Sequence, residues 1–146
     1  MKKHYPFINP SILRSLFFIL IYLYSFVAIA QPQLSVVTDK SPGASVNNGL
    51  SKLMGALKSK SIQFEKVNSV DEARGKVVIV AGLSTGNGEA AQLLQTAKRT
   101  TPAVPEALTI WKTDYKKKIV WVVSGFDERG LMYALLDVAD RVSWSS

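Results

Sequence analysis

This chain contains no cysteine, and its single histidine, His4, lies within the first thirty residues. Without thiols there can be no disulfide framework, so a domain formed after residue 30 must be stabilised by its hydrophobic core. Residues 31–146 therefore contain neither histidine nor cysteine. That excludes Ser-His-Asp and Cys-His nucleophilic sites there, and it excludes zinc sites built on those ligands. We therefore expect no metal site.

A strong excess of one charge is also missing after residue 30. Lys2, Lys3 and Arg14 are three of the 18 basic residues, and all 11 acidic residues come later, which leaves 15 basic and 11 acidic side chains and a net charge of +4. The only basic cluster, residues 116–118, is typical of a solvated hairpin turn. Nucleic-acid binding requires a basic stripe with aromatic platforms, so we expect no nucleic-acid partner.

Residues 1–30 have the pattern of a secretory signal peptide. Two lysines precede an apolar run from Leu16 to Ala30, which ends in the small-x-small signal Ala28-Ile29-Ala30. The run is shorter than the roughly 20 residues of a membrane span. We expect cleavage before Gln31, export to the periplasm or the exterior, and membrane contact only through the signal. An uncleaved N-terminal anchor is the alternative.

Residues 31–146 have the length of one ordinary domain. Hydrophobic periodicity predicts strands over 34–38, 62–67, 76–81, 107–114 and 118–124, with helices over 46–57, over 90–97 and from about 127. The predicted order is β-α-β-β-α-β-β-α. Short connections require hairpins and helical connections allow crossovers, so the fold class is α+β, a mixed sheet with helices packed on it.

A glycine-rich loop matches part of a dinucleotide-binding motif. Residues 86–91 fit G-x-G-x-x-A and open a helix after a strand. In such sites the first glycine makes the turn at the strand end, whereas Gly86 comes several residues after Ala81. Glu89 also brings a negative charge to the helix N-terminus, where a pyrophosphate would sit. We expect a structural turn and no cofactor.

No pair of carboxylates is spaced as a glycosidase site requires. Asp127 is better interpreted as the N-cap of the last helix, with Glu128 in its first turn complementing the helix dipole. We predict no catalytic residue and no activity of the chain by itself. A small enzyme that uses carboxylates alone stays an alternative.

Two tryptophans, Trp111 and Trp121, lie on the two arms of the predicted hairpin, where they are expected to come near each other. If exposed, they could stack on sugar rings; if buried, they would belong to a core or an interface. An independent carbohydrate-binding module that uses them is therefore an alternative function.

The last helix has an unusually wide apolar surface. One stripe suits packing on a sheet, and a second stripe beside it consists of Met132, Leu136 and Ala139. Together they cover an arc of about 200°, against the ~100° or more of a surface helix. A neighbouring domain or another helix of the same domain would cover the second stripe, and the pattern leaves both open.

Several segments together resemble a known family. "VPEALTIWKTDYKKKIV" at 104–120, "VVSGFDERGLMYALLDVADRV" at 122–142 and "VVIVAGLSTGNGEAAQLL" at 77–94 are similar to the non-catalytic N-terminal domain of secreted bacterial glycoside hydrolases of the β-hexosaminidase and α-glucuronidase type. The shared pattern is a Pro-Glu strand, a hairpin, an apolar strand and Gly-x-Asp-x-x-Gly before a helix. In this pattern Asp127 and Gly130 are structural cap and turn positions.

The resemblance spans residues 34–143 and implies an α+β domain that precedes a catalytic (β/α)₈ barrel. The barrel carries the catalytic acids in that family, and this sequence ends at Ser146, where a barrel would begin. We therefore expect a truncated or stand-alone accessory domain whose partner is a glycoside hydrolase catalytic domain. In that case the second stripe of the last helix is the surface that would pack against the barrel.

Overall fold

A computed structural model describes residues 32–39 and 41–145. The predicted signal peptide lies outside the described residues. The elements are β1 (Leu34–Thr38), α2 (Ala44–Ser59), β2 (Phe64–Val67), β3 (Val77–Leu83), α3 (Glu89–Thr96), β4 (Leu108–Tyr115), β5 (Lys118–Gly125) and α4 (Glu128–Trp144). This order confirms the predicted α+β pattern. No helix of this described part is long and apolar enough to cross a membrane.

The strands form one mixed sheet in the order β2-β1-β3-β5-β4. Four strands run parallel, and β4 alone is antiparallel, paired with β5 through the hairpin. The hairpin turn is Lys116-Lys117, both with positive φ (49° and 63°), which matches a two-residue type I′ turn. β3 is central and its interior is buried on both faces, which explains its continuous apolar sequence.

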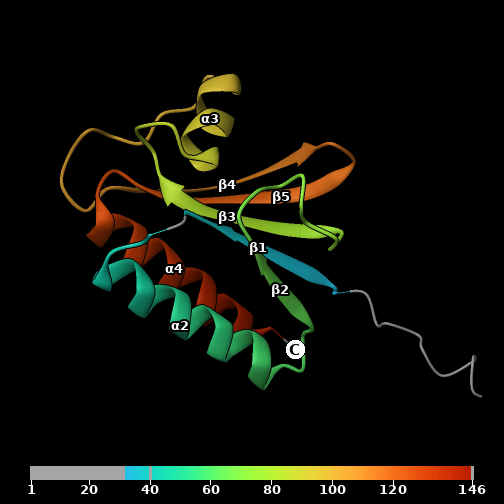
Figure 1. Ribbon diagram of the computed structural model, residues 1–146. Helices are drawn as coiled ribbons and strands as arrows, with labels where there is room; N and C mark the ends of the chain where they lie inside the picture. Colours follow the sequence, from blue (N-terminus) through green and yellow to red (C-terminus); the bar gives the residue numbers. More distant parts are fainter. Residues whose placement is uncertain (1–31, 40, 146) are drawn as a thin grey trace, which may run out of the picture. The chain divides into compact units, whose positions relative to one another are not determined.

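Helices cover both faces of the sheet, as Figure 1 shows. On one face α2 and α4 lie side by side, and their leucines Leu50, Leu53, Leu57 and Leu135 meet Val36, Ile79 and Val123 of the strands. On the other face α3 and the segment before β3 bury Val37, Val78, Val80, Val120 and Val122. The three layers therefore contain two separate apolar cores, one on each side of the sheet.

Residues from separate elements also hold the sheet together near its β2 edge. The Glu65 carboxylate of β2 accepts hydrogen bonds from the Ser35 hydroxyl of β1 (2.7 Å) and from the Arg74 backbone N–H (2.6 Å). The Arg74 guanidinium completes an ion pair at 2.7 Å. Burial would raise the pKa of Glu65, but these bonds and the adjacent positive charge outweigh it and lower the pKa to about 2.

Candidate functional site

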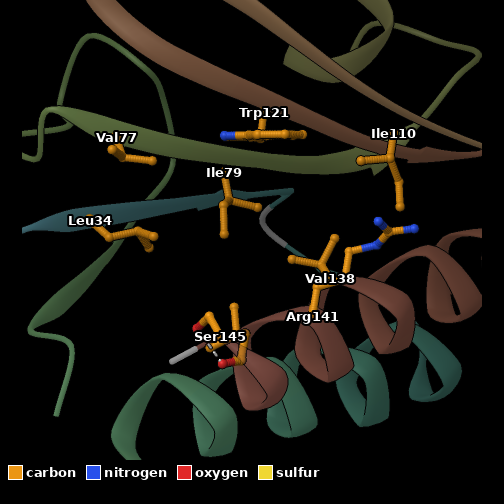
Figure 2. A pocket seen from close by; sticks show the side chains of 9 residues that line it. Leu34, Val77, Ile79, Ile110, Trp121, Val138, Arg141 and Ser145 are labelled. Carbon is orange, nitrogen blue, oxygen red and sulfur yellow. Dashed lines mark hydrogen bonds between the residues drawn. The ribbon is translucent and has the colours of Figure 1, made fainter. Parts of the chain in front are cut away.

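An apolar groove of about 430 Å³ lies between the sheet and the C-terminal half of α4. Figure 2 shows the Trp121 ring on the sheet side and Val138 on the helix side. The groove is lined by residues of β1, β3, β4, β5 and α4, and by Ser145, which follows α4. These residues are Leu34, Val77, Ile79, Ile110, Trp121, Val138, Arg141, Val142 and Ser145. The volume falls within the range of small-molecule pockets.

Trp121 is the most distinctive group in this groove. The residue is 39% exposed, which is high for a tryptophan on a strand whose neighbours Val120 and Val122 are fully buried. The Lys112 ammonium lies 6.0 Å from the centroid of its ring, within the range of a cation–π contact. The ring therefore offers an exposed aromatic surface at the mouth of an apolar groove.

The polar groups at the rim are engaged only in part. The Arg141 guanidinium donates from Nε to Asp137 one helical turn earlier (2.8 Å), and the Ser145 hydroxyl donates to the Val142 carbonyl (2.7 Å). The Lys60 ammonium donates to the Ser145 carbonyl. Within the described residues, the N–H groups on the two Nη atoms of Arg141 make no hydrogen bond. The groove can therefore take an apolar side chain or the apolar face of a ring, with the Arg141 guanidinium as the donor at its rim.

Trp111 and Trp121 lie on opposite faces of the sheet, so the expectation that they come near each other was wrong. Trp111 pairs with Val122, and Trp121 pairs with Lys112. Side chains alternate along a strand, and this register directs Trp111 to the α3 face. There Trp111 packs against the second core, with the Arg99 guanidinium carbon 5.7 Å from its ring centroid.

The second stripe of α4 lies along α2. Ala139 is only 5% exposed and belongs to the core between the helices, while Met132 and Leu136 are half-buried. Leu136 and Ala139 also line an outer groove between the two helices, with Ser51, Lys52, Gly55, Ala56, Ser59, Asp140 and Ser143. α2 thus covers one side of the stripe, and Leu136 still faces the outer groove.

Asp127 is the N-cap of α4, and its two carboxylate oxygens have different partners. Oδ1 accepts from the Gly130 N–H at 2.8 Å, and Oδ2 accepts from the Glu106 N–H at 3.0 Å. The hydrogen bond from Gly130 is the largest cause of the lowered pKa of Asp127, followed by that from Glu106. Only glycine fits at position 130, because a Cβ there would lie 2.3 Å from the Ala107 carbonyl oxygen.

The glycine-rich loop ends at Gly88, the N-cap of α3. A Cβ at Gly88 would lie 2.9 Å from a carboxylate oxygen of Asp39, so a carboxylate of the protein approaches the helix end where a pyrophosphate would bind. Gly86 has a φ of +90°, as a turn glycine does. Within the described residues, no three histidine, cysteine or acidic side chains gather as a metal site would require.

The groove and the Glu65 cluster were not predicted from the sequence. Both are assembled from segments far apart in the chain, and the periodicity within one segment says nothing about which segments meet. Trp121 was the one signal available for the groove, as a large aromatic residue on a predicted strand.

The fold of this chain is similar to part of two solved glycoside hydrolase structures. One is CpGH84D, which is 14% identical with a TM-score of 0.60 over 80% of this chain and 19% of that chain. The other is a GH138 enzyme targeting pectin rhamnogalacturonan II, 18% identical with a TM-score of 0.51 over 78% of this chain and 14% of that chain. This chain thus spans less than a fifth of either. The sequence matches no family model and no curated protein.

Proposed function

We propose that this chain is an exported, non-catalytic accessory domain that packs against the catalytic domain of a glycoside hydrolase. The observation that carries the proposal is the pair of structural similarities, in which most of this chain corresponds to a small part of a much longer glycoside hydrolase. The sequence resemblance to the N-terminal domain of such enzymes is a second, independent support.

The surface that would contact the catalytic domain is the outer groove between α2 and α4. Leu136 brings an apolar side chain to it, and small residues of α2 leave room for a close approach. Gly55 is notable because a Cβ there would meet no atom within 4 Å. A glycine inside a helix costs about 1 kcal/mol relative to alanine, and the packing of this domain does not require that glycine.

Leu136→Glu tests this surface in a co-purification experiment. The tagged domain is co-expressed with a glycoside hydrolase barrel encoded in the same genome, and we expect the wild-type domain to retain the barrel and Leu136→Glu to lose it. Val104→Glu is the matched control, since Val104 is an apolar residue that is 55% exposed and does not line the outer groove. Equal retention by both variants would contradict the proposed surface.

An activity assay tests the non-catalytic part of the proposal. The purified protein is incubated with a panel of aryl glycosides, and we expect no release of the aryl group. Turnover that persists after removal of contaminating enzymes, and that disappears in a variant of one carboxylate of this chain, would contradict the proposal.

Sugar binding at Trp121 is a second candidate function, favoured by the exposed ring at the mouth of the groove. Tryptophan emission should then change when oligosaccharides are added, and Trp121→Ala should abolish the change. Trp111→Phe is the control, because Trp111 packs on the other face of the sheet. No change across an oligosaccharide panel would remove this candidate.

A further inference from the structure

The edge of the sheet at β4 is open to another strand. β4 is the last strand in the sheet order and pairs only with β5; Figure 1 shows the hairpin that joins the two. The two-residue turn makes Tyr115 and Lys118 a hydrogen-bonded pair. Along an antiparallel ladder, hydrogen-bonded pairs alternate with pairs that are not hydrogen-bonded. The odd-numbered residues of β4 therefore bond to β5. The 2.9 Å bond from the Phe126 N–H to the Ala107 carbonyl continues that alternation.

The even-numbered residues of β4 direct their backbone groups away from β5. These residues are Leu108, Ile110, Lys112 and Asp114. Within residues 32–39 and 41–145, no hydrogen bond outside the β4–β5 ladder involves their N–H or C=O groups. An unpaired strand edge of this kind is a template for pairing with another chain.

The five residues at the hairpin end of β4 form a self-complementary pattern. From Trp111 to Tyr115 the order is aromatic, cation, threonine, anion, aromatic. Trp111 and Tyr115 share the α3 face, where both pack against the second core. Lys112 and Asp114 lie on the opposite face; both are exposed, and neither forms an ion pair within the described part of the chain.

We propose that two copies of this chain pair antiparallel through β4, with the twofold axis at Thr113. In this register Lys112 lies opposite Asp114 of the second copy, and Asp114 lies opposite Lys112 of the second copy. Each Trp111 likewise meets Tyr115 of the other copy, and the two Thr113 side chains are neighbours. Opposite charges and aromatic pairs across two strands are stabilising. Lys112 and Asp114 also have the outward backbone groups that the new ladder needs.

Other symmetric registers lack this match. An axis at Lys112 places the two lysines opposite each other, and like charges in that position are destabilising. An axis at Trp111 places Lys112 opposite Ile110 and Asp114 opposite Leu108, so both charges face apolar side chains. The side chains therefore select the axis at Thr113, and the dimer would have a continuous sheet across the two copies.

Charge exchange at two positions tests this register by sedimentation equilibrium. For the wild-type protein we expect the dimer fraction to rise over a range from about 10 μM to about 1 mM. Lys112→Asp and Asp114→Lys each create two like-charge pairs, so each should weaken dimerisation at least about tenfold. The double variant Lys112→Asp/Asp114→Lys restores the opposite charges and should restore dimerisation. An equal mixture of the two single variants should form a heterodimer.

Lys66→Asp is the matched control, because Lys66 is an exposed lysine on β2 at the other edge of the sheet. It should leave dimerisation unchanged, and circular dichroism of every variant checks that the fold is retained. A wild-type protein that stays monomeric up to about 1 mM would overturn the proposal. So would single variants that dimerise like the wild type, or a double variant that dimerises no better than the single ones. These outcomes do not depend on the accessory role of the domain.

Discussion

Glu65→Gln should destabilise the domain in a way that depends on pH. The carboxylate of Glu65 accepts hydrogen bonds from the Ser35 hydroxyl and the Arg74 backbone N–H, and it forms an ion pair with the Arg74 guanidinium. The Ser35 oxygen in turn accepts from the Gly75 N–H at 2.9 Å. The cluster therefore links β2, β1 and the turn before β3. A glutamine keeps the size of the side chain and removes the charge and one acceptor.

The magnitude follows from the pKa of Glu65, which is lowered from 4.5 to about 2. A shift of this size corresponds to an upper limit of about 3 kcal/mol. The Arg74 side chain is 65% exposed, so solvent screens part of its attraction. We therefore expect Glu65→Gln to lower the free energy of unfolding at pH 7 by about 1 to 2 kcal/mol.

The sign of the pH dependence is fixed by the lowered pKa. The contribution of the carboxylate is complete above the unfolded-state value near 4.5 and is lost as the pH falls towards about 2. Urea unfolding of both proteins at pH 7, 4 and 2.5 should thus give a difference that shrinks as the pH falls. Asp140→Asn, on the exposed side of α4, is the control and should change little. A difference that is the same at pH 7 and pH 2.5 would refute the reasoning.

Three further predictions concern packing and are measured as free energies of unfolding in urea. Gly130→Ala should destabilise by at least about 2 kcal/mol, because the new Cβ would lie 2.3 Å from the Ala107 carbonyl oxygen; a neutral effect would mean that this turn is loosely packed. Gly55→Ala should stabilise by about 1 kcal/mol, since the added Cβ meets open space; a loss of stability would contradict that geometry. Leu135→Ala should cost about 2 to 5 kcal/mol and Leu136→Ala about 1 kcal/mol, because Leu135 is fully buried and Leu136 is half-buried. Equal losses would contradict this assignment of the two stripes.

The secondary structure of this domain could be predicted because its signals are local. Each signal lies within a single helix or strand. The three signals are the helical spacing of Val46, Leu50, Leu53 and Leu57, the apolar run of β3, and the cap at Asp127. The mixed sheet followed from the connections, since short links require hairpins and helical links allow parallel strands.

The placement of the two hairpin tryptophans could not be predicted, because it depends on the register. The turn at Lys116-Lys117 pairs Trp111 with Val122 and Trp121 with Lys112. A shift of one residue in pairing moves a side chain to the other face of the sheet. The sequence indicated a tight turn, but it did not establish which tryptophan belongs to which face.

The partner of the wide apolar helix was also beyond the sequence. The helical wheel indicated that α4 needs cover on two sides, and the structure places α2 along one of them. Gly49 of α2 permits the close approach, because a Cβ there would lie 2.9 Å from the Leu135 Cβ. Periodicity describes which side of one helix is apolar, whereas the identity of its neighbour depends on how the whole chain folds.

The central claim, that this chain is an accessory domain of a glycoside hydrolase, is tested most directly by the DNA sequence that follows the codon for Ser146. We expect this DNA to encode a catalytic barrel, either in frame or displaced by a single frameshift. Unrelated sequence after a genuine stop codon, in a genome that encodes no glycoside hydrolase, would contradict that role.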